Sequence, residues 1–266
     1  MPHLTLSEIY IYPVKSLGGI SVNSALAEER GLKYDRRFLL VDENNMFMTQ
    51  RDFAEMALLK LSFGENGFKV LNTKDGSHII LPFESNSQEI MSVKIWDDVC
   101  DAVRVNQDLD VWFSQAIKKK CTLVYMPHDE KRTVEKKYIN ENYIVSFADA
   151  YPYLIIGQSS LDDLNTRLEK PLPMNRFRPN FIFSGGRPYE EDNWKDFRIN
   201  NIDFTAVKPC ARCVITTTNQ ETAERSSEPL KTLSLYRKFD NKVLFGMNVI
   251  GKNNGTVSVG HRIFLY

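Results

Sequence analysis

The sequence has few cysteines, no apolar run long enough to cross a membrane and no excess of charge of either sign. Four cysteines in 266 residues, at positions 100, 121, 210 and 213, are too few for a disulfide-stapled secreted scaffold. No window holds the ~18 apolar residues of a membrane span. The N-terminus lacks the basic and apolar regions of a signal peptide. These absences favour a reduced, cytoplasmic protein with no membrane partner.

The charge balance argues against partners that bind through long-range attraction. Lys and Arg together number 34, and so do Asp and Glu. A net charge of zero gives no general pull toward nucleic acid or an anionic membrane. We therefore expect no nucleic-acid partner, and any anion site must be a local cluster of basic residues.

The hydrophobic pattern is mostly that of short β-strands. Hydrophobic residues make up 42% of the chain, including 16 Phe and 11 Tyr that can fill a core. Short alternating or apolar runs bounded by turn residues predict strands at 4–12, 37–42, 47–51, 68–72, 78–82, 92–96, 153–156, 180–183, 204–207, 257–260 and 263–265. Turn residues predict a hairpin between 37–42 and 47–51, and Asp75-Gly76 predicts another between 68–72 and 78–82.

Helices are fewer. We expect one from an Asp108 N-cap to about Lys118, a second capped by Ser159 or Ser160, and a third starting near Pro229. The apolar positions of the first are Val111, Trp112, Ala116 and Ile117, and those of the second are Leu161, Leu164 and Leu168. Strands and helices do not alternate regularly, which argues against a doubly wound parallel sheet. The pattern predicts a β-rich α+β protein whose N-terminal part is barrel-like.

Residues 126–142 are polar and aperiodic. This stretch predicts a long surface loop, which is either a lid or partner surface or a solvated connection without a further role.

The sharpest local motif is Lys208-Pro209-Cys210-Ala211-Arg212-Cys213. A Cys-x-x-Cys pair is typical of a dithiol redox site, of half a zinc site, or of one thiolate metal ligand beside a bystander cysteine. The βαβ context of the first is missing, and no other cysteine or histidine pair supplies the second. Two buried, inert cysteines remain an equal alternative.

Two further segments carry basic residues next to turns. Residues 12–19 end a strand with a lysine, a serine and a glycine pair, a composition that can present N–H donors to an anion. Residues 175–180 place Arg176 and Arg178 on either side of an aromatic, where they could hold a phosphate. Each segment taken alone is better explained as a surface turn.

Taken together and in this order, the short motifs resemble the MOSC family. They are Tyr-Pro-Val-Lys-Ser-Leu at 12–17, Asp-Arg-Arg-Phe at 35–38, Thr-Gln-Arg at 49–51, Arg-Pro-Asn at 178–180, the cysteine motif at 208–213 and Phe-Gly-x-Asn at 245–248. The resemblance covers essentially the whole chain. It is closest to the two-part members, in which a MOSC N-terminal β-barrel precedes the MOSC domain, a group that includes amidoxime-reducing proteins and bacterial proteins that detoxify N-hydroxylated bases. It implies a division into 1–122 and 123–266.

The resemblance also implies a molybdenum–molybdopterin cofactor in the cleft between the two parts. Carried over residue by residue, the metal ligand and catalytic residue is Cys213, and Cys210 has no assigned role. The positions implied to hold the pterin or its phosphate are Lys15, Ser16, Arg37, Asp149, Arg178, Asn180, Ala211 and Asn248. Lys15, Arg37 and Arg178 are expected to converge on the phosphate.

The activity implied is two-electron reduction of N-hydroxylated small molecules, with the metal accepting the oxygen as N–OH becomes N–H. The alternatives are a carrier that holds molybdopterin or a Cys213 persulfide without turnover, and a thiol–disulfide oxidoreductase. The four cysteines lack an iron–sulfur cluster spacing. We therefore expect a separate electron donor, a ferredoxin-like or flavin protein, with residues 129–132 as one candidate docking surface.

Overall fold

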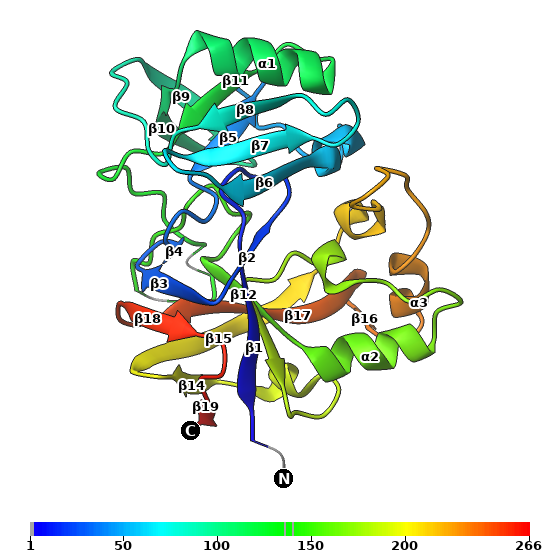
Figure 1. The fold of residues 1–266 in the computed structure, drawn as a ribbon. Helices are drawn as coiled ribbons and strands as arrows, with labels where there is room; N and C mark the ends of the chain where they lie inside the picture. Colours follow the sequence, from blue (N-terminus) through cyan, green and yellow to red (C-terminus); the bar gives the residue numbers. More distant parts are fainter. Residues whose placement is uncertain (1–2, 136, 140) are drawn as a thin grey trace.

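The structure is a computed structural model that describes residues 3–135, 137–139 and 141–266 (Figure 1). Its largest element is a nine-stranded sheet that combines strands from both ends of the sequence. The strands are β1 Thr5–Ile11, β2 Ile20–Val22, β12 Tyr153–Gly157, β13 Phe181–Ser184, β14 Asp196–Ile199, β15 Ile202–Ala211, β16 Lys238–Phe239, β17 Lys242–Gly251 and β19 Ile263–Leu265. They follow the order β19-β14-β15-β17-β12-β13-β1-β2, with β16 added to β17. The pairings are antiparallel except for β12 with β13, which is parallel.

The upper half of Figure 1 holds two smaller antiparallel sheets and the helix α1. One sheet has the order β5-β11-β10-β9 and the other the order β6-β7-β8. The bounds are β5 Phe38–Val41, β6 Leu59–Phe63, β7 Phe68–Asn72, β8 His78–Leu81, β9 Ile90–Ile95, β10 Asp98–Arg104, β11 Thr122–Tyr125, α1 Gln107–Ile117 and the 3-10 turn η1 Ala54–Leu58.

A third small sheet and the remaining helices surround the large sheet. The sheet has the order β18-β3-β4, with bounds β3 Ser24–Glu28, β4 Gly31–Leu32 and β18 Gly255–Ser258. The helices are α2 Gln158–Thr166, α3 Leu230–Ser234, and the 3-10 turns η2 Met174–Arg176, η3 Glu190–Asn193 and η4 Val214–Thr217. None of the helices in the described part of the chain is long and apolar enough to cross a membrane.

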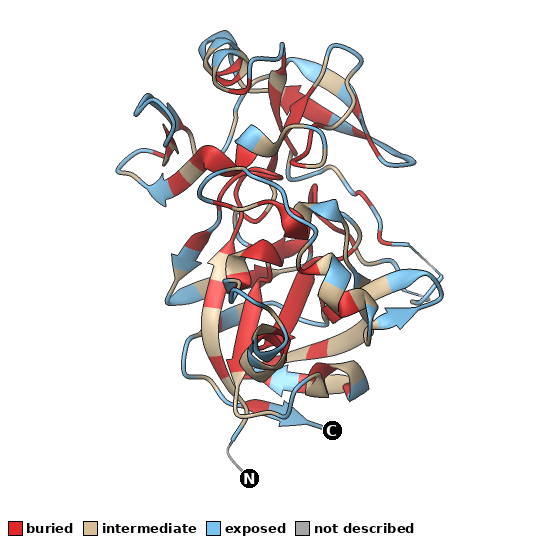
Figure 2. Cartoon of the chain, turned by 90° about the vertical axis from the view of Figure 1, so that its right-hand side faces the viewer, coloured by how far each residue is buried: buried red, intermediate tan, exposed pale blue. Residues whose placement is uncertain are grey.

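One hydrophobic cluster joins the two halves. It contains Phe68 and Phe113 from the upper half and Tyr153, Phe181 and Phe204 from the large sheet, all fully buried. Buried residues accordingly occupy the interior of both halves in Figure 2. The β-rich α+β fold class is confirmed. Since β1 and β2 pair in the large sheet and β11 pairs with β5, strand pairing does not separate the chain at residue 122, and the division 1–122 and 123–266 stays a prediction.

The strand predictions are confirmed where polar and apolar residues alternate clearly. They are wrong where the chain forms a turn with buried side chains. Residues 68–72 and 78–81 form the expected hairpin. The expected hairpin between 37–42 and 47–51 forms only at its turn end, where an antiparallel bridge joins Val41 to Phe47 and the Met48 amide donates to the Leu40 carbonyl at 2.8 Å. The expected strand 47–51 is wrong, and β5 pairs with β11. Residues 49–53 turn instead, and the buried Gln50 amide donates to the Ser16 carbonyl at 2.7 Å. The strands that were not predicted are β2, β3, β4, β6, β10, β11, β14, β16 and β17.

The helix caps differ from those expected. The N-cap of α1 is Asn106, whose side chain accepts from the Leu109 amide at 2.9 Å, and Asp108 lies in the first turn. The buried face of α1 includes Leu109, Phe113 and Ile117, at spacings of four, so the expected inward position of Val111 is wrong.

The second and third helices follow the expected positions more closely. The N-cap of α2 is Gly157, because the Ser160 hydroxyl is used to donate to the buried Glu191 carboxylate. Leu161 and Leu164 are buried as expected, and Leu168 packs beside them just beyond the helix. Pro229 does precede α3.

The polar stretch 126–142 has no named helix or strand among its described residues, as expected; positions 136 and 140 lie outside the described residues. Asp129 and Lys131 are exposed, but Arg132 is buried and cannot be a docking residue. Its guanidinium pairs with Asp98 at 2.8 Å and donates to the carbonyls of residues 146, 148 and 149. Arg132 therefore fastens the segment that carries Asp149.

Candidate functional site

A cavity of about 270 Å³ lies where the loop after β1 meets the ends of β15 and β17, and we call it the Cys213 cavity. Eight of the nine residues predicted for the site line it: Lys15, Ser16, Asp149, Arg178, Asn180, Ala211, Cys213 and Asn248. These come from separate segments of both halves of the sequence, so the fold brings together residues up to more than two hundred positions apart.

Arg37 is the ninth, and the structure does not bring it to the cavity. Its buried side chain points to the upper half, where Nη2 donates to the Met126 carbonyl at 2.6 Å and to the Tyr125 hydroxyl at 3.2 Å. The neighbouring Arg36 lines the cavity instead. The expected convergence of Lys15, Arg37 and Arg178 is therefore wrong for Arg37.

Positive charge dominates the Cys213 cavity. One carboxylate, Asp149, is set against six basic residues: Lys15, Arg36, Arg51, Arg178, Lys208 and Arg212. In a chain without net charge, this is a strong local concentration of cations. The cavity therefore favours an anionic ligand.

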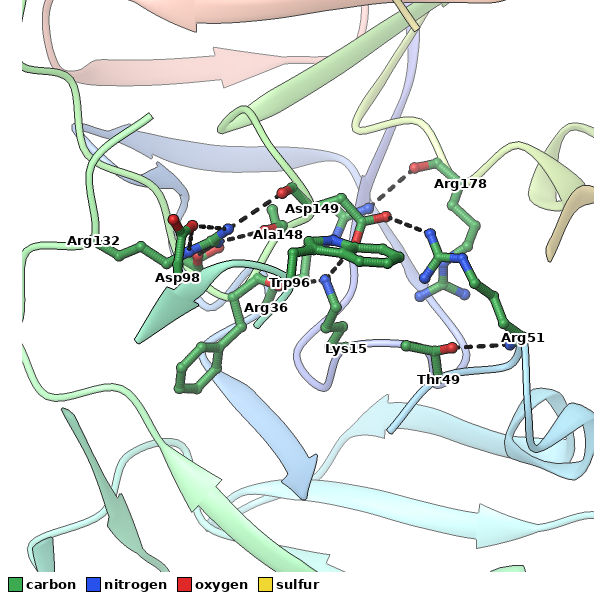
Figure 3. A network of polar contacts seen from close by, with 12 residues as sticks. Lys15, Arg36, Thr49, Arg51, Trp96, Asp98, Arg132, Ala148, Asp149 and Arg178 are labelled. Atoms are coloured by element: carbon green, nitrogen blue, oxygen red, sulfur yellow. Dashed lines mark hydrogen bonds and ion pairs between the residues drawn. The ribbon is translucent and has the colours of Figure 1, made fainter. Parts of the chain in front are cut away.

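Asp149 is the partner of two of these cations (Figure 3). Its carboxylate accepts from Lys15 Nζ at 2.6 Å and from Arg51 Nη2 at 3.4 Å, and the Trp96 indole donates to it at 3.4 Å. Desolvation opposes ionisation, yet the charges of Lys15 and Arg51 hold the pKa of the Asp149 carboxyl well below its usual range. Desolvation lowers the pKa of the Lys15 ammonium to about 8, although Asp149 pulls it upward.

Arg36 and Arg178 share one aromatic support. Both guanidinium carbons lie over the buried Tyr12 ring, 4.4 Å and 4.3 Å from its centroid. The ring is itself positioned by Gly19, since a Cβ there would lie 2.5 Å from a Tyr12 ring carbon. This contact explains one glycine of the 12–19 motif.

The two arginines differ in their partners. Arg36 Nη1 pairs with Asp35 at 2.6 Å and donates to the Asn180 side chain at 3.1 Å. Arg178 Nη2 is buried without a hydrogen-bond partner among the described residues. Desolvation lowers the pKa of the Arg178 guanidinium to about 10. An anionic ligand would therefore supply the charge partner and hydrogen-bond acceptor that the desolvated Arg178 guanidinium lacks among the described residues.

The backbone around the cavity is strained at three lining residues. Ser16, Arg36 and Arg178 have φ values of 67°, 48° and 57°, in the left-handed region. For residues with a side chain this conformation costs roughly 1–2 kcal/mol each. Such strain is concentrated at functional sites.

Cys213 and Cys210 have different surroundings. Cys213 precedes η4, is partly buried, and its sulfur has no hydrogen-bond partner among the residues described. The sulfur of Cys210 accepts from Arg212 Nη1 at 3.0 Å, and Cys210 packs against a hydrophobic cluster. All four cysteines are unpaired thiols. Within the described ranges, no three His, Cys, Asp or Glu side chains gather in a way that could hold a metal ion.

Sequence reasoning missed four residues at or beside the cavity: Tyr12, Arg36, Arg51 and Trp96. The first three belong to motifs that carry the family resemblance. Those motifs indicated the site but did not assign a role to these three residues. Trp96 reaches Asp149 from the turn between β9 and β10, far along the chain, and no local pattern indicates this.

The fold and the cavity define a β-rich protein that gathers cations from both halves of its sequence around two thiols, Cys210 and Cys213. Two family models match consecutive parts of the chain: the MOSC N-terminal beta barrel domain over residues 3–120 and the MOSC domain over residues 142–264. The chain belongs to the MOSC family, in its two-part form, which confirms the resemblance inferred from the motifs.

Relatives with the same two parts align along nearly the whole chain. The mitochondrial amidoxime reducing component 2 of Rattus norvegicus is 32% identical over 281 residues, which cover 98% of this chain and 82% of that protein. The mitochondrial amidoxime-reducing component 1 of Mus musculus is 30% identical over 279 residues with the same coverage. The molybdenum cofactor sulfurase of Oryza sativa subsp. japonica is 32% identical over 91% of this chain, which spans 32% of that longer protein.

Proposed function

We propose that the Cys213 cavity binds a molybdenum–molybdopterin cofactor and that the Cys213 thiolate is its protein metal ligand. The observation that carries this proposal is the Cys213 thiol, which has no hydrogen-bond partner among the described residues and lies in a cavity lined by six basic residues and one carboxylate. A thiolate is a suitable ligand for a soft or high-valent metal. The amidoxime-reducing relatives and the sulfurase, whose name refers to the molybdenum cofactor, support the same assignment.

The residues present fit such a group. Arg178 Nη2 and Arg51 Nη1 are buried donors without partners among the described residues, and phosphate oxygens would accept hydrogen bonds from them. Lys15, Ser16, Arg36 and Arg178 would hold the phosphate-bearing end. Ala211, Cys213 and Asn248 would lie at the metal end, and Asn180 positions Arg36 through its side-chain oxygen.

We further propose that the protein is a two-electron reductase of N-hydroxylated small molecules. The bound cofactor would supply the redox step that converts N–OH to N–H, while the protein positions the substrate and excludes water. The names and near-complete alignment of the rat and mouse relatives support this activity.

The matched pair Cys213→Ser and Cys210→Ser tests the ligand assignment. We expect Cys213→Ser to abolish reduction of an N-hydroxylated compound by reduced viologen and to lower the molybdenum content per chain. Cys210→Ser should retain substantial activity, because its thiol is hydrogen-bonded to Arg212 and packed against a hydrophobic cluster. A Cys213→Ser protein that is fully active and replete in molybdenum would contradict the proposal. Loss of activity in Cys210→Ser alone would mean that the metal ligand is Cys210 and not Cys213.

A second candidate function is a carrier that holds molybdopterin or a persulfide on Cys213 without turnover. The sulfurase relative, which matches 91% of this chain, favours it. The two functions differ in turnover: molybdenum and pterin on the purified chain without any reduction of N-hydroxylated compounds would favour the carrier.

We also propose a cytoplasmic location and a separate electron donor, either a ferredoxin-like or a flavin protein. The donor is required by the reductase proposal, because two electrons must reach the cavity in each turnover. Of the surface first considered for its docking, Asp129 and Lys131 remain available, whereas Arg132 is buried.

A further inference from the structure

A second and larger cavity, of about 630 Å³, lies beside the turn that follows Cys213. None of its lining residues lines the Cys213 cavity. It is formed by the segment after α2, by the chain after η4 and by the start of α3. We call it the Arg176 cavity, after its most deeply buried charged residue.

Arg176 has no counter-ion in the described part of the chain. Its residue surface is 4% exposed, and Nε donates to the Thr216 carbonyl at 2.8 Å. Within the described chain, its two terminal nitrogens have no hydrogen-bond acceptor and no carboxylate within 4.0 Å. Buried arginines are almost always paired. The guanidinium therefore presents unsatisfied donors to the cavity that it lines.

Arg176 and Arg178 belong to one basic motif in the sequence, but their side chains lie in different cavities. Arg178 lines the Cys213 cavity and Arg176 lines the second one. Arg176 ends the 3-10 turn η2, and Arg178 follows two residues later with a left-handed φ of 57°. One motif thus supplies a desolvated cation to each cavity.

The rim of the Arg176 cavity adds two exposed ammonium groups, those of Lys170 and Lys231, neither of which is in an ion pair in the described chain. Other charges of the lining are already engaged. Arg167 pairs with Asp163, and Arg225 donates to the carbonyls of residues 50 and 51. The lining carboxylates are those of Glu169, Glu224 and Glu228. Two of them are partly engaged: Glu224 accepts from the Thr222 hydroxyl and Glu228 from the Thr232 amide.

We propose that the Arg176 cavity binds a small phosphate-bearing molecule, with the Arg176 guanidinium as the anchor of a phosphoryl group and Lys170 and Lys231 at the mouth. A planar guanidinium with free terminal nitrogens matches two phosphoryl oxygens. The volume lies within the range of small-molecule sites, about 300–1,000 Å³. The acidic surface of a protein is a poorer fit, because a flat partner does not reach a residue that is 4% exposed.

The proposal is tested on the full chain as purified, with inorganic phosphate and pyrophosphate as probes. Binding is measured by calorimetry and by thermal unfolding, against sodium chloride at equal ionic strength. We expect saturable binding of pyrophosphate at the Arg176 cavity, apart from any binding in the cation-rich Cys213 cavity. Because Arg176 Nε also holds the turn that follows Cys213, Arg176→Lys is used instead of an alanine. This substitution removes the two-pronged contact and should weaken binding at least tenfold.

A variant of the two lysines at the mouth tests the proposal without replacing Arg176, which also holds the turn after Cys213. Lys170→Gln/Lys231→Gln should weaken pyrophosphate binding several-fold. The matched control Lys119→Gln/Lys242→Gln, which removes two exposed lysines outside the cavity, should bind like the parent. Arg178→Gln should leave the Arg176-dependent part of the binding unchanged, because Arg178 lines the other cavity.

Three results would overturn the proposal. The first is no saturable binding beyond that of chloride. The second is an equal loss in the rim variant and its control. The third is binding that survives Arg176→Lys but is lost in Arg178→Gln, which would place the anion in the Cys213 cavity. Binding of an acidic polypeptide without binding of phosphate would likewise exclude a phosphate site.

Discussion

Replacing Arg178 by glutamine should weaken cofactor binding without weakening the fold. Among the described residues, the Arg178 guanidinium has no carboxylate partner, and one of its terminal nitrogens is buried without a hydrogen-bond partner. In the cofactor-free chain, relief of this desolvated charge offsets the lost contact with Tyr12, so the free energy of unfolding should change by less than about 1 kcal/mol. With the cofactor bound, the lost charged hydrogen bond should cost about 1.5–3 kcal/mol. The dissociation constant should therefore rise about 10- to 150-fold.

The neighbouring motif supplies a control with the opposite behaviour. Arg37→Gln removes a donor from the buried Met126 carbonyl, which should lower the free energy of unfolding by about 1–3 kcal/mol. It should leave cofactor affinity unchanged, because Arg37 does not line the Cys213 cavity. Urea unfolding of the cofactor-free chains measures the first effect. Molybdenum and pterin retained after dialysis, with a fluorescence titration, measure the second.

The reasoning is refuted if the two variants exchange behaviour. A glutamine at position 178 that keeps the cofactor as tightly as the parent would mean that the unpaired guanidinium does not face the ligand. A glutamine at position 37 that loses the cofactor without loss of stability would restore the role first assigned to Arg37 by family resemblance.

Three further predictions concern pH, the Asp149 segment and the electron donor. Between about pH 8 and 10.5 the unfolded chain holds the Lys15 proton and the folded chain has lost it, so the unfolding free energy of the cofactor-free chain should rise across this window; urea unfolding of Lys15→Met should show no such rise. Arg132→Met leaves buried carbonyls without their donor and should lower the unfolding free energy by about 2–4 kcal/mol, and a loss below about 1 kcal/mol would contradict its fastening role. Reduction driven by a protein donor should fall as ionic strength rises while reduction by viologen changes little, and full-rate turnover of the chain with NADH alone would exclude the need for a donor.

Much of the fold was predictable because alternation marks half-buried strands directly. In β1, Leu6, Ile9 and Ile11 are buried, and the bulge between Leu6 and Glu8 shifts the register without ending the strand. Asp75-Gly76 marked its hairpin correctly because Gly76 has a φ of 75°. Pairing between distant segments, such as β5 with β11, leaves no such local signal.

The site was predictable to the level of the motif and not always to the residue. Arg36 and Arg37 are adjacent, and the choice between them depends on one backbone angle. Arg36 has a φ of 48°, which interrupts the extended chain before β5 and turns its side chain to the Cys213 cavity. Side-chain alternation along a strand does not extend through a left-handed residue, so the sequence pattern alone could not assign the two arginines.

The charges of the Cys213 cavity link cofactor binding to stability. Desolvation lowers the pKa of both Lys15 and Arg178, which means that the empty cavity holds positive charge at a cost. Asp149 and Asp35 offset part of it through Lys15 and Arg36. An anion that binds only the folded chain adds a stability of RT ln(1 + [L]/Kd), about 4 kcal/mol at a thousandfold excess over Kd. The strained, cation-rich arrangement is therefore better explained as a site completed by its ligand than as a feature that stabilises the chain alone.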